Sequence, residues 1–156
     1  MSASISPASV KDLWEIDRIE RDAFPTPWSM ELLRAAVLSK KYEVRVLRNS
    51  LAPVLGFYIT HGSGQQCNLD NLAVDQPLRG QGFGSVLIRD WIERARTRQS
   101  AALTLQVNTA NDAAQRLYQA FDFKTTRLLT GYYPNGDDAY QMEMALRPVQ
   151  FFLNTM

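Results

Sequence analysis

Leu69 to Ser85 read L-D-N-L-A-V-D-Q-P-L-R-G-Q-G-F-G-S, and this stretch decides the predicted fold. Its first six residues form a mainly apolar run typical of a strand. The segment Asp75–Leu78 breaks that run, alternating glycines follow, and an amphipathic helix is predicted from about Ser85. A strand that leads through a Gly-rich turn into a helix builds an anion site, because the first helical N–H groups lack intrahelical acceptors and the helix dipole adds positive charge.

The glycines and Arg79 favour a phosphate ligand over a plain strand–helix turn. Glycine allows positive φ angles and a close approach of the backbone to a ligand. The guanidinium of Arg79 offers a donor fork suited to phosphate. No G-K-[ST] follows, so the stretch is not a Walker loop, and its G-x-G-x-G spacing does not match the dinucleotide-binding fingerprint.

The rest of the chain predicts one α/β domain over residues 1–156, with a central mixed, mostly antiparallel sheet flanked by helices. The helix after the glycines would connect two parallel neighbouring strands. Gly56 marks a candidate bulge, His61 opens a loop, and the apolar residues of the tail 147–156 are candidates for docking. Helices are predicted over Val10–Asp22, Met30–Ser39, Ser85–Thr97 and Asp112–Ala120, and strands near Ile5 and over Tyr42–Leu47, Val54–Thr60, Asn68–Val74, Ala101–Val107, Lys124–Tyr132 and Ala139–Leu146.

Composition narrows the class of protein. The net charge of +1 gives no strong field for nucleic acid or a membrane surface. No apolar run approaches the ~20 residues of a membrane-spanning helix, and the first residues lack the features of a signal peptide. Cys67 is the single cysteine, so no intrachain disulfide is expected and a reducing, cytoplasmic location fits. No metal is expected.

The segment R-G-Q-G-F-G resembles the R/Q-x-x-G-x-G/A pyrophosphate loop of the GNAT acetyltransferase superfamily, in which it also follows a V-D-P-like turn. The order of predicted elements matches the GNAT fold too. The resemblance implies acetyl-CoA as cosubstrate, with the acetyl group and pantetheine beside the end of the strand and the pyrophosphate over the loop. The implied cofactor-binding residues are Leu72, Ala73, Val74, Arg79, Gly80, Gln81, Gly82, Phe83, Gly84, Ser85, Asn111 and Tyr118.

A closer resemblance is to bacterial ribosomal-protein N-terminal alanine acetyltransferases and to protein N-terminal acetyltransferases generally. It rests on A-N-D-A-A-Q-R-L-Y-Q-A-F-D-F (110–123), F-P-T-P-W-S (24–29), N-L-A-V-D (71–75) and G-Y-Y-P (131–134). The resemblance implies that Tyr118 is the acid that protonates the leaving thiolate. The alternative is that Tyr118 is an aromatic residue of the apolar core. The implied contacts to a peptide substrate are Phe24, Trp28, Tyr132 and Tyr133.

One position departs from the family pattern. The family's W-L-E-V strand supplies a glutamate base, and this chain has Gln106 in T-L-Q-V. An amide cannot accept the ammonium proton as a carboxylate can. Asp70 is a candidate substitute, because polyamine acetyltransferases look similar in carrying an acidic residue there; the alternative is a solvated carboxylate at the strand end. Gln106 would then bind substrate or position water.

The missing glutamate base affects which amine is expected to accept the acetyl group. A peptide α-amine titrates near ~7.7–8.0, whereas a lysine near ~10.4 costs about 3–4 kcal/mol to deprotonate at about pH 7.5. We therefore expect direct acetyl transfer from acetyl-CoA to a protein N-terminal α-amine. A small amine such as a polyamine is the alternative acceptor, favoured by Asp70 and Gln106. A catalytically silent acyl-CoA-binding protein is the alternative of another class.

Overall fold

The computed structural model describes residues 2–50, 52–62 and 64–146. The predicted docking of the tail lies outside the described residues. The helices are α1 (Leu13–Ala23), α2 (Met30–Leu38), α3 (Phe83–Thr97) and α4 (Asp112–Ala120), with short 3-10 turns at Val10–Asp12 and Gln76–Leu78. The strands are β1 (Ser4–Pro7), β2 (Tyr42–Arg48), β3 (Gly56–His61), β4 (Gln66–Val74), β5 (Ala102–Asn108), β6 (Lys124–Leu129) and β7 (Ala139–Ala145).

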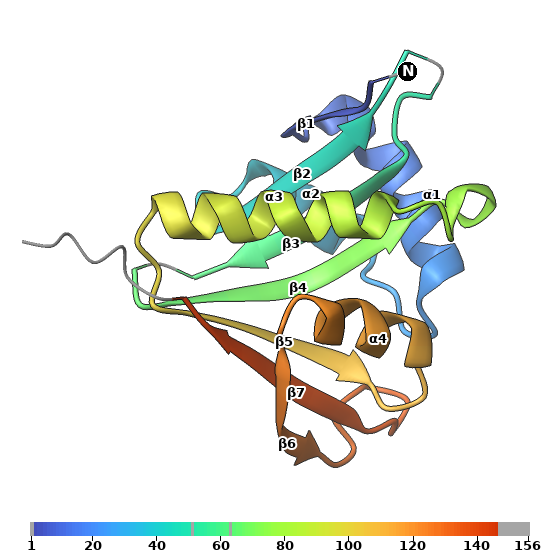
Figure 1. Ribbon diagram of the computed structural model, residues 1–156. Helices are drawn as coiled ribbons and strands as arrows, with labels where there is room; N and C mark the ends of the chain where they lie inside the picture. Colours follow the sequence, from blue (N-terminus) through green and yellow to red (C-terminus); the bar gives the residue numbers. More distant parts are fainter. Residues whose placement is uncertain (1, 51, 63, 147–156) are drawn as a thin grey trace, which may run out of the picture.

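The described strands form one sheet in the order β1-β2-β3-β4-β5-β7-β6. Only the pair of β4 and β5 is parallel, and α3 makes the crossover between them. Every other pair is antiparallel. The predicted mixed, mostly antiparallel sheet and its crossover helix are therefore confirmed. In Figure 1, α3 and α4 lie on one face of this sheet, and α1 and α2 lie behind it.

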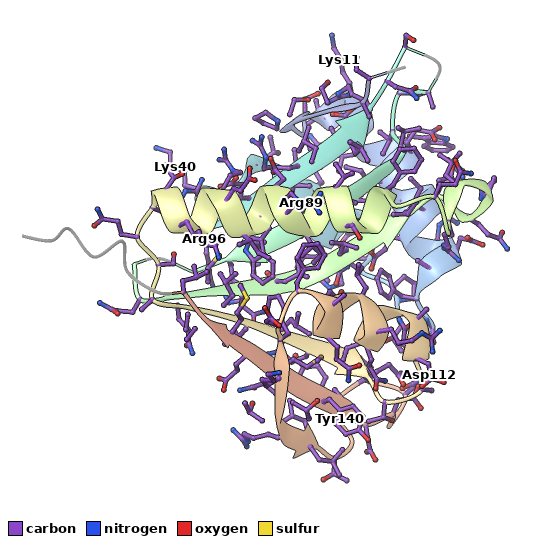
Figure 2. The ribbon with its side chains drawn as sticks, viewed as in Figure 1. Lys11, Lys40, Arg89, Arg96, Asp112 and Tyr140 are labelled. Carbon is purple, nitrogen blue, oxygen red and sulfur yellow. The ribbon has the colours of Figure 1, made fainter. Side chains whose placement is uncertain are left out.

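Two apolar cores form on the two faces of the sheet. The first packs α3 and Tyr118 against the sheet and includes Trp91 and Phe123, whose rings stack 5.8 Å apart. The second packs α1 and α2 on the other face. Charged side chains of α3, among them Arg89 and Arg96, are exposed on the outer side of that helix (Figure 2).

Several boundaries differ from the prediction. The strand expected from Val54 begins at Gly56, and His61 belongs to that strand rather than to a loop. The strand expected to reach Tyr132 ends at Leu129, so Tyr132 and Tyr133 lie in the connection to β7 rather than in a strand. Helix α3 begins at Phe83, two residues earlier than expected, because Gly82 serves as its N-cap and Gly84 lies in its first turn.

The bulge between β3 and β4 is not at Gly56. The register of β3 against β4 shifts where Ile59 pairs with Asn71 and Thr60 pairs with Leu69, so Asp70 is the extra residue of β4. Gly56 has a different reason: a Cβ there would lie 2.8 Å from the carbonyl oxygen of Ala73, which requires a residue without a side chain. Because a bulge offsets the alternation of side chains, the adjacent residues Asp70 and Asn71 can serve the same face of the sheet.

The parallel strands stay together for only four residues. Pairing runs from Gln66 with Ala102 to Leu69 with Leu105, and it stops there. Beyond that point β4 continues to Val74 along β3, and β5 continues to Asn108 along β7. The sheet therefore opens between β4 and β5, as Figure 1 shows.

Candidate active site

Two cavities meet at the opening between β4 and β5. The first, of about 770 Å³, lies between the loop after α1, the two strands and the connection before β7. The second, of about 530 Å³, lies between the end of β4, the glycine loop and α4. Both are lined by Ala23, Phe24, Leu72, Asn111 and Ala114, so they share a wall. Two ligands that enter from the two sides can touch at this wall.

The second cavity is built as an anion cradle. Gly80 and Gly82 have φ angles of +79° and +90°, and a Cβ at either would meet no atom within 4 Å, so the loop is concave and open. Val86 N–H donates to the carbonyl oxygen of Gly82 (3.2 Å), which leaves the preceding N–H groups of α3 without an intrahelical acceptor. These donors and the dipole of a 15-residue helix fit a pyrophosphate.

Arg79 is held at the entrance of this cavity. Its Nε donates to the carbonyl oxygen of Val74 (3.0 Å), and its guanidinium lies 3.3 Å from a carboxylate oxygen of Asp22. Both side chains of this ion pair are about half exposed, so water screens the attraction between them. The guanidinium is therefore weakly restrained and can turn toward an anion in the loop.

The end of β4 offers backbone donors to the shared wall. Asp75 N–H donates to Leu55 (2.9 Å), on the β3 side of the strand. Successive N–H groups of a strand point in opposite directions, so those of Val74 and Leu72 point toward the opening. They stand where a donor would meet a carbonyl oxygen that bridges the two cavities.

Tyr118 presents its hydroxyl to the first cavity. Its ring is buried and lies edge-on to Phe123 at 6.1 Å. Within the part of the chain that the structure describes, no group hydrogen-bonds to the hydroxyl, and no fully buried side-chain oxygen lacks a partner. Burial, and then the charge of Tyr133, raise the pKa of Tyr118. Tyr118 therefore stays protonated at neutral pH and can donate its proton.

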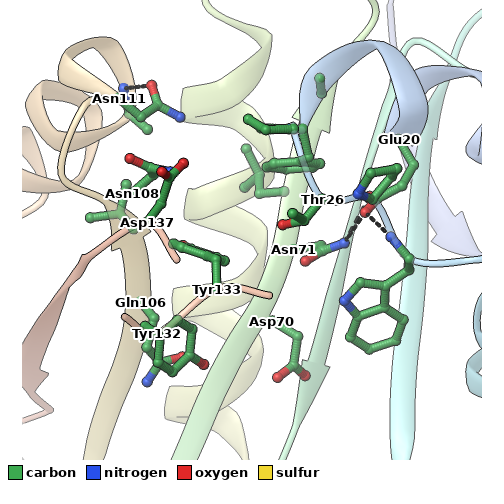
Figure 3. Close-up of a pocket in the computed structure, with 18 of the residues that line it drawn as sticks. Glu20, Thr26, Asp70, Asn71, Gln106, Asn108, Asn111, Tyr132, Tyr133 and Asp137 are labelled. Carbon is green, nitrogen blue, oxygen red and sulfur yellow. Dashed lines mark hydrogen bonds between the residues drawn. The ribbon is translucent and has the colours of Figure 1, made fainter. Parts of the chain in front are cut away.

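Asp70 lies on the other side of the first cavity, opposite Gln106 (Figure 3). Its carboxylate accepts from His61 Nδ1 (2.7 and 2.8 Å) and from Asn68 Nδ2 (3.0 Å). Burial raises the pKa of Asp70, and the contacts with His61 and Asn68 oppose that rise. A buried carboxylate with a raised pKa is a stronger proton acceptor than one in water.

Gln106 is tied into the same network. Its Nε2 donates to Asn68 Oδ1 (3.2 Å), which also accepts from Thr104 Oγ1 (2.7 Å). Asn68 therefore connects the amide of Gln106 to the carboxylate of Asp70. With its amide N–H donated inward, Gln106 holds Asn68 and has no basic group to offer.

Glu20 is a site residue that the sequence did not reveal. It lies on α1 with no exposed surface and lines the first cavity. Its oxygens accept from Trp28 N–H (2.9 Å) and from Asn71 Nδ2 (2.7 Å), as the dashed lines in Figure 3 show. Burial raises the pKa of Glu20 to about 7, against the lowering effect of these two bonds. Glu20 thus fixes the loop of Trp28 to β4.

The structure brings nearly all of the predicted residues to the two cavities. The predicted cofactor residues line the second cavity, except that Gln81 lines neither and Tyr118 lines the first. Asp70, Gln106 and the four predicted substrate residues line the first cavity. Asn111 also caps α4, accepting from Ala114 N–H (3.1 Å). Glu20, His61, Asn68 and Asn71 were missed, because their roles arise from contacts between distant segments.

Comparison with known proteins agrees with this arrangement. The sequence model of the Acetyltransferase (GNAT) family matches residues 13–123. The chain is 29% identical over 134 residues, 86% of its length, to the ribosomal protein bS18-alanine N-acetyltransferase of Escherichia coli strain K12, and covers 89% of that protein. It is 27% identical over 146 residues to the same-named protein of Salmonella typhimurium, covering 92% of this chain and 97% of that one.

Solved structures show the same relationship. The crystal structure of the ribosomal-protein-S18-alanine N-acetyltransferase from E. coli superposes with a TM-score of 0.84 at 28% identity, covering 97% of this chain and 99% of that one. Ard1 from Thermoplasma volcanium gives 0.86 at 25% identity, covering 94% and 99%.

The fold and the two joined cavities are those of an acyl-transferring enzyme of the GNAT type. Since the family model covers well over half of the chain, the protein belongs to the acetyltransferase (GNAT) family. The predicted fold and N-acetyltransferase class are confirmed.

Neither a membrane-spanning helix nor a cluster of metal-ligating side chains occurs in the described residues. None of the helices is long and apolar enough to cross a membrane. No group of three or more His, Cys, Asp or Glu side chains in residues 2–50, 52–62 and 64–146 is arranged to hold a metal ion.

Glu20 makes stability depend on pH. Its pKa is raised from 4.5 to about 7 in the folded state, so its favourable contribution is complete below about pH 4.5 and is lost as the pH rises through about 7. The loss amounts to about 3 kcal/mol at most. We expect Glu20→Gln, which stays neutral, to flatten the fall in the free energy of unfolding between about pH 5 and 8, as measured by urea denaturation.

Glu93→Gln is the matched control, since Glu93 is exposed on α3. It should leave the pH dependence unchanged. Equal slopes for Glu20→Gln and the unmodified protein would contradict the role assigned to Glu20.

Proposed function

We propose that this chain transfers the acetyl group of acetyl-CoA directly to the α-amine of a protein N-terminus. The observation that carries the proposal is the shared wall of the two cavities. One cavity is an anion cradle for coenzyme A, and the other is lined by the aromatic loop and by two tyrosines, whose rings lie edge to face 5.0 Å apart. Relatives that are named as ribosomal-protein alanine N-acetyltransferases support this class of acceptor.

The first cavity suits a peptide end. Phe24, Pro25, Pro27 and Trp28 form one side, and Tyr132 and Tyr133 belong to the other. Aromatic and proline side chains bind an extended chain with little loss of their own freedom. The ionisable groups that line the cavity are acidic or phenolic, so they favour a cationic amine. The single buried cysteine and this acceptor class are consistent with a cytoplasmic enzyme.

The proposed reaction has one covalent step. The neutral amine nitrogen attacks the thioester carbonyl carbon, the C–S bond breaks, and the thiolate leaves with the proton of the Tyr118 hydroxyl. The amine proton passes to the Asp70 carboxylate. The N–H groups of Leu72 and Val74 stabilise the negative charge that develops on the carbonyl oxygen. No covalent enzyme intermediate forms.

The acceptor is tested with a panel of peptides with varied first residues beside polyamines and other small amines. We expect acetyl-CoA turnover with peptide α-amines, greatest for particular first residues, and no acetylation of an internal lysine detected by mass spectrometry. Turnover confined to small amines would mean that the acceptor is a polyamine-type amine and not a protein N-terminus. No turnover with any amine would favour a silent acyl-CoA-binding protein.

Tyr118→Phe tests the proton donor. Loss of a positioned acid typically costs about 10²-fold or more, so kcat should fall by about that factor while the KM for acetyl-CoA stays nearly constant. Tyr140→Phe is the control, because Tyr140 lies on β7 and lines neither cavity. An unchanged kcat in Tyr118→Phe would remove Tyr118 from the mechanism.

Gly82→Ala tests the coenzyme A cradle. Gly82 and Gly64 both have positive φ (+90° and +65°) and open space around a Cβ, so alanine at either costs about 1–2 kcal/mol of stability through backbone strain. Of these two glycines, Gly82 lines the second cavity and Gly64 does not. We expect the Kd for acetyl-CoA, measured by calorimetry, to rise about tenfold or more in Gly82→Ala and to stay constant in Gly64→Ala. Equal Kd values would contradict the cradle.

A further inference from the structure

His61 is the one histidine of the chain, and it contacts Asp70, the proposed base. It ends β3, and its Nδ1 lies 2.7 and 2.8 Å from the two carboxylate oxygens of Asp70. The Asp70 side chain is 13% exposed, and that of His61 is 36% exposed. A carboxylate only accepts hydrogen bonds, so Nδ1 carries the proton in this contact.

The contact forms beside the bulge in β4. His61 pairs across the sheet with Asn68, and the extra residue Asp70 follows two positions later without a partner on β3. Because side chains alternate along a strand, Asn68 and Asp70 reach the same face, where Asn68 and His61 both donate to the carboxylate.

The histidine ring is held by aromatic neighbours. The ring of Tyr42 lies 5.5 Å from it, and Tyr42 in turn meets Trp28 edge-on at 5.9 Å. Lys41 lies over the Tyr42 ring at 5.6 Å. These contacts help to hold the ring with its Nδ1 at Asp70.

Burial alone would drive Asp70 toward its neutral form, in which it could not accept a proton. Of the groups that favour its ionised form, His61 has the largest effect, followed by Asn68 and then the charge of Lys41. Two further titratable groups lie near Asp70. Burial, and then the charge of Asp70, raise the pKa of the Tyr132 phenol, and Glu20 accepts a hydrogen bond from Asn71, the residue after Asp70 on β4. His61 is thus the principal support of the Asp70 carboxylate.

We propose that His61 is the positioning residue of this enzyme: its Nδ1–H holds the Asp70 carboxylate ionised and aimed at the acceptor amine. The proposal rests on the proposed function in taking Asp70 as the base. It also explains how a GNAT chain with Gln106 in place of a glutamate retains a base. A His–Asp pair on neighbouring antiparallel strands replaces a single carboxylate on β5.

Two substitutions separate the donor from the ring. His61→Phe keeps an aromatic ring against Tyr42 and loses the donor, whereas His61→Gln keeps a donor and loses the ring. The rate constant kcat/KM is measured from about pH 6 to 9 with whichever amine the unmodified enzyme acetylates fastest. Dividing each variant's value by that of the unmodified enzyme cancels the ionisation of the amine itself.

We expect the ratio for His61→Phe to stay near one at high pH and to fall several-fold toward the acid end, because without the Nδ1–H donor the Asp70 carboxylate takes up its proton at a higher pH. The ratio for His61→Gln should stay within about threefold of one, since an amide N–H restores the hydrogen bond. Asp70→Asn should lose about 10²-fold, and adding His61→Phe to it should change the rate less than about twofold.

A flat ratio for His61→Phe, no rescue by His61→Gln, or additive effects of His61→Phe and Asp70→Asn would each overturn the proposal. Because the amine is chosen by rate, turnover of small amines alone would refute the peptide assignment and leave this test intact. No turnover with any amine would overturn both.

Nitrogen-15 NMR provides a readout that does not need turnover. With one histidine in the chain, its two ring nitrogens give the only imidazole signals. We expect a protonated Nδ1 in the neutral ring of the unmodified protein and a mixed tautomer population in Asp70→Asn. An unprotonated Nδ1 at pH 8 in the unmodified protein would overturn the proposal.

Discussion

The site depends on one constraint in the sheet, the end of pairing between β4 and β5 after Leu69 and Leu105. A continued ladder would close the sheet and satisfy the backbone groups of both strands internally. The opening instead leaves the outward N–H groups of Leu72 and Val74 available, and it lets both cavities reach the same wall. Beyond the opening, β4 stays paired with β3 and β5 stays paired with β7, so both strands keep their extended conformation.

Buried polar residues define the walls around this opening. Glu20 joins α1 to β4 and to the loop of Trp28, and the network of Gln106, Asn68, Asp70 and His61 crosses β5, β4 and β3 in turn. Each of these groups has a partner, which is the condition under which a buried polar network holds one geometry. The same burial that makes the network rigid raises the pKa of its two carboxylates.

Local chemistry explains which parts could be predicted. The glycine loop and the helices depend on short segments of sequence, so they were predicted at nearly the right positions. Asp70 was proposed from the resemblance to the acidic residue of polyamine acetyltransferases, and no local pattern indicates the bulge at which it lies. Glu20 and His61 read as an ordinary helix residue and a loop residue. Their partners lie 8 to 51 positions away along the chain, which periodicity does not report.

The shared wall has a consequence for ligands that span it. Ala23, Phe24 and Leu72 line both cavities, and the two cavities are otherwise lined by different elements. Coenzyme A and a peptide that are joined through the transferred carbon would occupy both cavities in one molecule. The second half would then bind at a high effective concentration, so affinity would greatly exceed that of either half alone. The opening in the sheet therefore makes this fold a natural target for linked inhibitors.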